Sequence, residues 1–125
     1  MRKLFGPSPI PEKFKGYPKE MAVRPSQIRA SAEESALMIP DAFMFREEYP
    51  NLSMPVVIIA GEEDRLIDIN KQSARLHRDV KQSTLHRVRG AGHMIHQTAT
   101  KLVMAAIDEA SGAKSHGLKV VREAA

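Results

Sequence analysis

The sequence predicts an α/β fold in which two parallel strands are flanked by helices. Three features indicate it: the β-branched run "MPVVIIAG" at 54–61, a helical pattern at 69–80, and a second strand-like run, "STLHRV", at 83–88. A strand, a helix and a strand within about 35 residues are typical of a βαβ unit. A crossover of this length joins strands that run in parallel, and it is right-handed.

Residues 1–53 are expected to hold a proline-rich lead-in and a helical segment. The lead-in, 1–25, contains five prolines, which disfavour a helix or a central strand: Pro7, Pro9, Pro11, Pro18 and Pro25. Good helix formers occupy 26–38, after a serine that can act as N-cap. Pro40 is expected to end or kink that helix, and a second helical piece is expected at 41–49.

Residues 54–112 are expected to form a second part, built as strand, helix, strand and helix. The strand at 54–61 has no polar alternation, which is typical of a strand covered on both faces, as in a parallel sheet. The last helix is expected at 98–110, ending near Gly112, with one apolar face formed by three residues: Leu102, Ala106 and Ile107. Residues 113–125 are weakly patterned and are expected to form a tail.

Composition and charge narrow the classes of protein. The 125 residues are 42% hydrophobic and 27% charged, as in one ordinary globular unit, and the absence of cysteine favours the cytoplasm. The early prolines interrupt any signal peptide or membrane span, so no membrane association is expected. The net charge of +4 comes from scattered basic residues without a basic block, so no nucleic-acid partner is expected either.

Two polar loops follow the two predicted strands. "GEEDRLID" contains Asp64 and "GAGHMIH" contains His93. Because the carboxyl ends of parallel strands lie at one edge of a sheet, both side chains are expected to lie close together there. A carboxylate can accept the Nδ1 proton of an imidazole and so leave Nε2 free to remove a proton from a nucleophile. Gly90 and Gly92 would allow the unusual φ values or close backbone approach that such a turn needs.

The order of these motifs resembles a known family. "MPVVIIAGEEDRLID", followed by a helix, a strand, "VRGAGHMIHQ" and a closing helix, resembles the C-terminal part of an α/β-hydrolase over residues 54–110. The resemblance implies a partial α/β-hydrolase fold in which Asp64 is the acid and His93 the base of a catalytic triad. Residues 9–39 are similar to the mobile cap that many members place over their pocket. In the complete enzyme, the substrate would be an ester-like or related small molecule.

The sequence departs from the family at the nucleophile. Neither G-x-S-x-G nor the aspartate version, G-x-D-x-G, occurs in the chain. Ser8 has no strand before it, and Ser115 follows a helix and comes after the histidine. The oxyanion-hole donors belong to the nucleophile turn and to an earlier loop, so they are missing as well. We therefore expect a truncated chain that supplies the acid and the base and is inactive by itself.

A second interpretation stays open. The chain could be a non-catalytic fragment or a binding module that needs a partner to complete its sheet, or that self-associates through open sheet edges. No cofactor and no metal are expected, because the remaining histidines share no ligand spacing: His77, His86 and His116. The sequence leaves open the substrate, the nucleophile and the oligomeric state.

Overall fold

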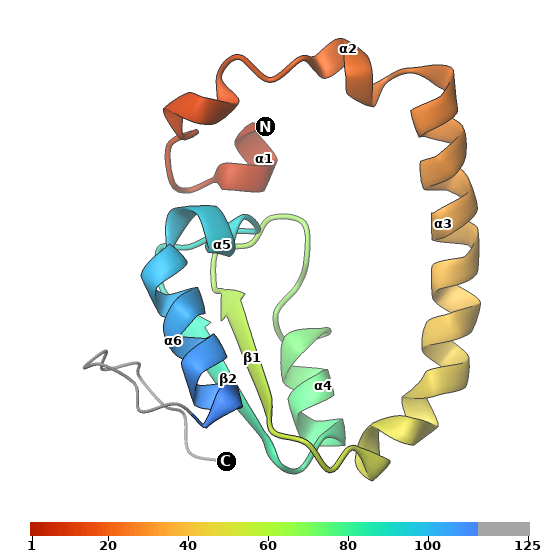
Figure 1. The fold of residues 1–125 in the computed structure, drawn as a ribbon, viewed down its shortest axis with the longest axis vertical. Coiled ribbons are helices and arrows are strands. Elements are labelled where there is room, and N and C mark those ends of the chain that lie inside the picture. Colours follow the sequence, from red (N-terminus) through yellow and green to blue (C-terminus); the bar gives the residue numbers. More distant parts are fainter. Residues whose placement is uncertain (113–125) are drawn as a thin grey trace. The chain divides into compact units, whose positions relative to one another are not determined.

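A computed structural model describes residues 1–112 of the chain (Figure 1). The chain divides into two units: a sheet unit, formed by Met1–Pro11 together with the chain from Ser53 onward, and a helical unit, Glu12–Leu52. The expected tail lies outside the described residues, and Ser115 and His116 lie there with it.

The sheet unit contains the two predicted strands, β1 (Val56–Gly61) and β2 (Ser83–Val88). They are hydrogen-bonded in parallel along their full lengths, with Val56 opposite Ser83 and Gly61 opposite Val88. The helix between them, α4 (Ser73–Asp79), contacts both strands. Figure 1 shows α4 and α6 on either side of the strands. The predicted α/β arrangement is thereby confirmed.

Burial differs between the two strands. Along β2 the residues are mostly buried, with Leu85 5% and Val88 8% exposed. Along β1, Val56–Ala60 are only half-buried, although their apolar sequence is typical of a strand covered on both faces. Within the described residues the sheet has two strands, so β1 has a strand beside it on one edge alone. This arrangement leaves β1 partly accessible.

The crossover helix α4 is shorter than predicted. The pattern at 69–80 suggested a helix from Ile69, but residues 69–72 form turns and the helix begins at Ser73. Asp68 directs this local structure, because its Oδ1 accepts hydrogen bonds from the backbone N–H groups of Asn70 (2.9 Å) and Lys71 (3.1 Å). A short acidic side chain that bonds the backbone in this way favours a turn over a helix.

Two helices complete the sheet unit, α5 (Ile95–Thr98) and α6 (Thr100–Ser111). The expected end of α6 near Gly112 is confirmed: Gly112 has φ +71° and its N–H bonds the carbonyls of the last turn. The predicted apolar face is wrong at Ile107, which is 53% exposed. At 100° per residue, Ile107 points about 140° away from Leu102, whereas Ala105 and Ala106 face inward and are buried.

The N-terminal segment of the sheet unit contains a one-turn helix, α1 (Arg2–Phe5). The prediction that residues 1–25 contain no helix is therefore wrong here, and also at α2 (Lys19–Ala22). α1 ends before the first proline, Pro7, and α2 lies between Pro18 and Pro25, so neither helix contains a residue that lacks its N–H group. Phe5 is the largest fully buried side chain, at 1% exposure.

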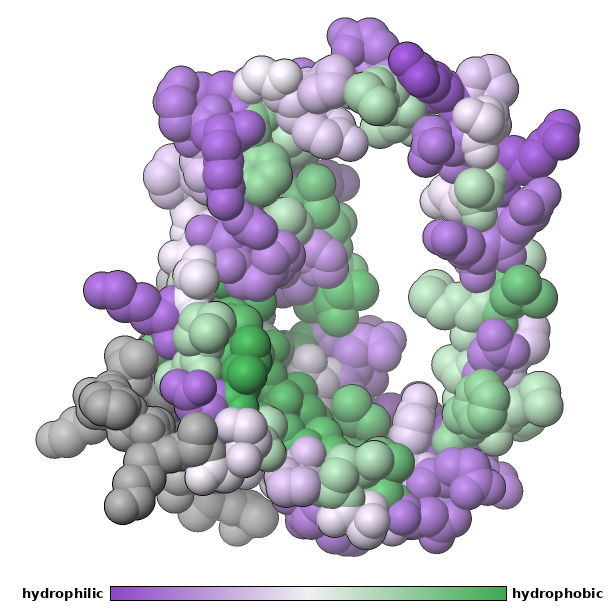
Figure 2. All heavy atoms as spheres, viewed as in Figure 1, coloured by the Kyte–Doolittle hydropathy of each residue, from purple (hydrophilic) through white to green (hydrophobic). Residues whose placement is uncertain are grey.

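The helical unit consists of η1 (Glu12–Phe14), α2, α3 (Pro25–Phe45) and η2 (Arg46–Asn51). The expected end of the helix at Pro40 is wrong, because α3 continues through it to Phe45. A proline removes one hydrogen bond of the helix, and the strong helix formers on both sides keep the remaining turns. Apolar side chains of α3 are exposed (Figure 2): Ile28, Leu37, Met38, Ile39, Phe43, Met44 and Phe45. No helix within residues 1–112 is long and apolar enough to cross a bilayer.

Candidate functional site

The two loops predicted to meet do meet, at the carboxyl edge of the sheet. The loop after β1 is joined to the loop after β2 by backbone hydrogen bonds from Glu62 N–H to the Val88 carbonyl (3.1 Å) and from Glu63 N–H to the Ala91 carbonyl (3.0 Å). The parallel register fixes this meeting, since Gly61 and Val88, the last residues of the strands, are paired. Asp64 and His93 project from these joined loops.

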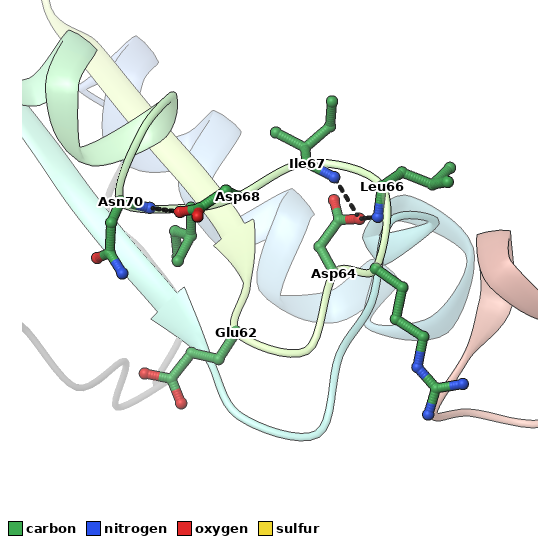
Figure 3. A pocket seen from close by; sticks show the side chains of 8 residues that line it. Glu62, Asp64, Leu66, Ile67, Asp68 and Asn70 are labelled. Atoms are coloured by element: carbon green, nitrogen blue, oxygen red, sulfur yellow. Dashed lines mark hydrogen bonds between the residues drawn. The ribbon is translucent and has the colours of Figure 1, made fainter.

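The carboxylate of Asp64 makes three hydrogen bonds. Its Oδ1 accepts from the backbone N–H groups of Leu66 (2.8 Å) and Ile67 (3.1 Å), as Figure 3 shows. Its Oδ2 lies 2.9 Å from Nδ1 of His93. The Asp64 side chain is 13% exposed and that of His93 is 36% exposed, so the carboxylate is shielded while the imidazole reaches the surface.

The environment keeps Asp64 ionised. Burial alone would raise the pKa of its carboxyl group, but the hydrogen bonds from Leu66, His93 and Ile67, together with the charge of His93, lower the pKa below 3.8. An ionised carboxylate has no proton to donate, so the hydrogen in the 2.9 Å contact must be carried by Nδ1 of His93. Nε2 of the neutral imidazole is then the atom with a free lone pair.

The turn before His93 depends on glycine for two different reasons. Gly90 adopts φ +73°, a left-handed conformation that other residues rarely take. Gly92 is outside that region, and its requirement is space, because its backbone lies against that of Gly6. On the opposite side, a Cβ on Gly61 would lie 2.6 Å from the carbonyl carbon of Ala91. Gly90 is thus needed for its backbone conformation, and Gly92 for the close approach of another backbone segment.

A hollow of about 430 Å³ lies along the acid loop. Figure 3 shows side chains that line it, and all come from one stretch of chain after β1: Glu62, Asp64, Arg65, Leu66, Ile67, Asp68, Ile69 and Asn70. Leu66 and Ile67 are 46% and 41% exposed, so the surface beside Asp64 is partly apolar. The hollow beside Asp64 is therefore lined mostly by polar and charged residues, together with the apolar Leu66, Ile67 and Ile69.

Two other histidines, His77 and His86, have structural partners that the sequence did not reveal. His86, on β2, is 1% exposed and its Nε2 lies 2.6 Å from a carboxylate oxygen of Glu109 on α6. His77 has its Nδ1 2.7 Å from the hydroxyl of Ser83, between α4 and β2. Within residues 1–112 no three metal-ligating side chains cluster together. The pairing of His86 with Glu109, 23 residues apart, could not be predicted from the sequence, because side chains repeat with different periods along a strand and along a helix.

Ser8, which the sequence disfavoured as a nucleophile, lies beside the histidine loop. Its Oγ donates a hydrogen bond to the carbonyl of Gly90 at 3.5 Å. Periodicity gave no sign that residues 1–11 reach this loop, because the contact joins positions 82 residues apart.

The sheet unit thus has two parallel strands with a carboxylate–imidazole pair at their carboxyl edge. Comparison with known proteins gives the family: the model of the family described as alpha/beta hydrolase fold matches residues 11–100. The chain belongs to this family.

One curated relative supports the same family. The chain is 35% identical over 54 residues to a protein named "Putative non-heme chloroperoxidase" from Synechocystis sp. (strain ATCC 27184 / PCC 6803 / Kazusa). The match covers 43% of this chain and 20% of that protein, so the chain spans about a fifth of the relative's length. No solved structure matches the chain.

Proposed function

We propose that this chain supplies the acid, Asp64, and the base, His93, of a hydrolase triad that acts on an ester-like or related small molecule. The observation that carries the proposal is the 2.9 Å contact between Asp64 Oδ2 and His93 Nδ1 at the carboxyl edge of two parallel strands. Membership of the α/β-hydrolase fold family supports it, since acid and histidine follow in that chain order in the family.

The proposed chemistry uses the free nitrogen of His93. Nε2 removes the proton from a nucleophile, a serine hydroxyl in the first instance, as that oxygen attacks the substrate carbonyl. The proton then passes from Nε2 to the leaving group, and Nε2 next activates the water that releases the acyl group. Asp64 stays ionised throughout and stabilises the imidazolium that forms between these steps.

The nucleophile is proposed to come from a segment beyond these 125 residues, because the chain has neither G-x-S-x-G nor G-x-D-x-G. The purified chain should therefore hydrolyse a p-nitrophenyl ester no faster than buffer does. Turnover that disappears in His93→Ala would refute the proposed division of the triad.

A hybrid enzyme tests the role of the pair directly. Residues 54–110 would replace their counterpart in an active member of the α/β-hydrolase family that contains its own G-x-S-x-G segment. The hybrid is expected to hydrolyse the ester, and His93→Ala is expected to lower kcat by about 10⁴-fold or more. His96→Ala, a change at an exposed histidine three residues away, is the matched control. Equal rates in the two variants would exclude His93 as the base.

A second candidate is a non-catalytic module that binds a partner through its sheet. It is favoured by β1, whose residues Val56–Ala60 are apolar yet only half-buried. Such a strand edge can pair with another strand, including that of a second copy. Sedimentation over a range of concentrations tests it: a monomer at all concentrations would argue against self-association, and a dimer lost on Ile58→Lys would favour it.

A further inference from the structure

The histidine loop is held on both sides of His93 by the N-terminal segment. The backbone carbonyl of Leu4 accepts a hydrogen bond from the N–H of Met94 at 3.1 Å. The hydroxyl of Ser8 donates to the carbonyl of Gly90 at 3.5 Å. Met94 directly follows His93 and Gly90 precedes it by three residues, so the two contacts lie on either side of the imidazole-bearing residue.

Between these two contacts the backbones touch. A Cβ added to Gly92 would collide with the carbonyl oxygen of Gly6 and would lie 3.0 Å from its carbonyl carbon. On its other side the loop lies against Gly61 at the end of β1, where a Cβ would lie 2.6 Å from the carbonyl oxygen of Gly92. The residue next to His93 is therefore enclosed between two backbone segments that leave no room for a side chain.

The segment that presses on the loop is itself anchored. Phe5 is 1% exposed, and α1 is closed by backbone hydrogen bonds from Leu4 and Phe5 to the Met1 carbonyl (3.0 and 3.1 Å). Gly6 N–H bonds the carbonyl of Arg2 at 2.9 Å, which fixes the direction in which the chain leaves the helix. A buried aromatic ring and a closed turn hold Gly6 in place against Gly92.

We infer that residues 4–8, here called the strap, are a positioning element that fixes the backbone on both sides of His93 and so keeps its Nδ1 in hydrogen-bond contact with Asp64. The inference rests on the proposed function, in which that contact sets the tautomer of the base. The strap touches neither a nucleophile nor a substrate in this proposal. It acts through His93 alone.

The acid provides an internal reference for a test. Asp64 is held by its own loop, through the N–H groups of Leu66 and Ile67, and those bonds do not involve the strap. Loosening the strap should therefore release His93 from Asp64 while the acid loop keeps its hydrogen bonds. A general loss of structure would weaken both sets of bonds together.

The experiment uses the full chain and NMR. Three quantities are followed: the Nδ1 proton of His93, the exchange rate of the Met94 amide, and the exchange rates of the Leu66 and Ile67 amides. Gly92→Ala forces the loop and Gly6 apart. Gly16→Ala is the matched control, because a Cβ at Gly16 meets nothing within 4 Å.

In the wild type, the Nδ1 proton is expected to be visible downfield and the Met94 amide to be protected from exchange. In Gly92→Ala, the downfield proton should disappear and the Met94 amide should exchange faster by on the order of tenfold or more, with Leu66 and Ile67 unchanged. Gly16→Ala should leave all three quantities as they are in the wild type.

Phe5→Leu is the second variant, in case Gly92→Ala does not fold, since it keeps an apolar side chain at the anchor. It should accelerate Met94 exchange and weaken the Nδ1 signal in the same direction. A wild type without the Nδ1 bond would overturn the proposed function and the strap with it. If the wild type has the Nδ1 bond but the strap variants keep it, the positioning role of the strap is refuted and the proposed function stands. The same holds if the wild type has the bond but its Met94 amide is unprotected from exchange.

Discussion

Replacing Asp64 by asparagine changes one atom of the pair and should reverse the direction of its hydrogen bond. The amide oxygen can still accept from the backbone N–H groups of Leu66 and Ile67, which Oδ1 bonds at 2.8 and 3.1 Å. The amide nitrogen then faces His93, and because it is a donor, Nδ1 must become the acceptor. The proton of the neutral imidazole moves to Nε2, which leaves the base with no lone pair for the nucleophile.

The cost in stability is worked from the two backbone hydrogen bonds, from Leu66 and Ile67, that the asparagine keeps. Hydrogen bonds to an ionised group contribute about 1.5–3 kcal/mol, and bonds between neutral groups about 0.5–1.5 kcal/mol. The two retained backbone bonds should each weaken by about 1 kcal/mol, so Asp64→Asn should lower the free energy of unfolding by about 2 kcal/mol. In urea this corresponds to a midpoint about 1 M lower, at an m-value of about 2 kcal/mol/M.

Two measurements distinguish the tautomer effect from simple destabilisation. Imidazole ¹⁵N shifts should report a proton on Nδ1 in the wild type and on Nε2 in Asp64→Asn. In the hybrid enzyme, Asp64→Asn should lower kcat by about 10⁴-fold, the size of the effect when this change is made in a serine protease triad. A variant whose Nδ1 stays protonated, with kcat near that of the parent hybrid, would refute the reasoning.

Three further predictions concern stability. Folding lowers the pKa of Asp64 below its ordinary value of 3.8, so ionised Asp64 stabilises the fold at pH values above the pKa of the unfolded state. This stabilisation is lost as the pH falls through the pKa of the folded state. The difference in unfolding free energy between wild type and Asp64→Ala should accordingly shrink below pH 3.8 in urea titrations. Gly61→Ala should cost about 1–3 kcal/mol by overpacking, whereas Gly16→Ala should not; equal thermal midpoints would contradict this. Glu109→Ala should cost about 1–3 kcal/mol because it leaves the buried His86 imidazole without its partner, and calorimetry that shows no change would exclude that role.

The features that sequence predicted best were those determined by local pattern and by topology. The run at 54–61 is apolar and β-branched, so its strand follows from the residues themselves. The approach of Asp64 and His93 follows from parallel topology, because both loops leave the same edge of the sheet. No long-range side-chain contact had to be known for either prediction.

The features that sequence missed depend on contacts without a periodic signal. The strap reaches the histidine loop through backbone atoms and the Ser8 hydroxyl, and glycine at positions 6 and 92 is equally typical of ordinary turns. The pairing of His86 with Glu109 joins a strand to a helix, and neither residue stands out in its own pattern. At Pro40 a local rule was applied too strictly, because the neighbouring helix formers outweigh the loss of one hydrogen bond.

The two members of the pair are held by different kinds of contact, and this difference bears on how the site is assembled. Oδ1 of Asp64 is held by backbone N–H groups only two and three positions along the chain. His93 is fixed by Gly61 and by the N-terminal segment, which are distant in sequence, so its geometry forms only when the sheet unit is folded. The base is therefore the member whose position depends on tertiary structure. In the proposed function, the segment that carries the nucleophile would therefore have to approach a histidine loop whose backbone lies against Gly6 and Gly61.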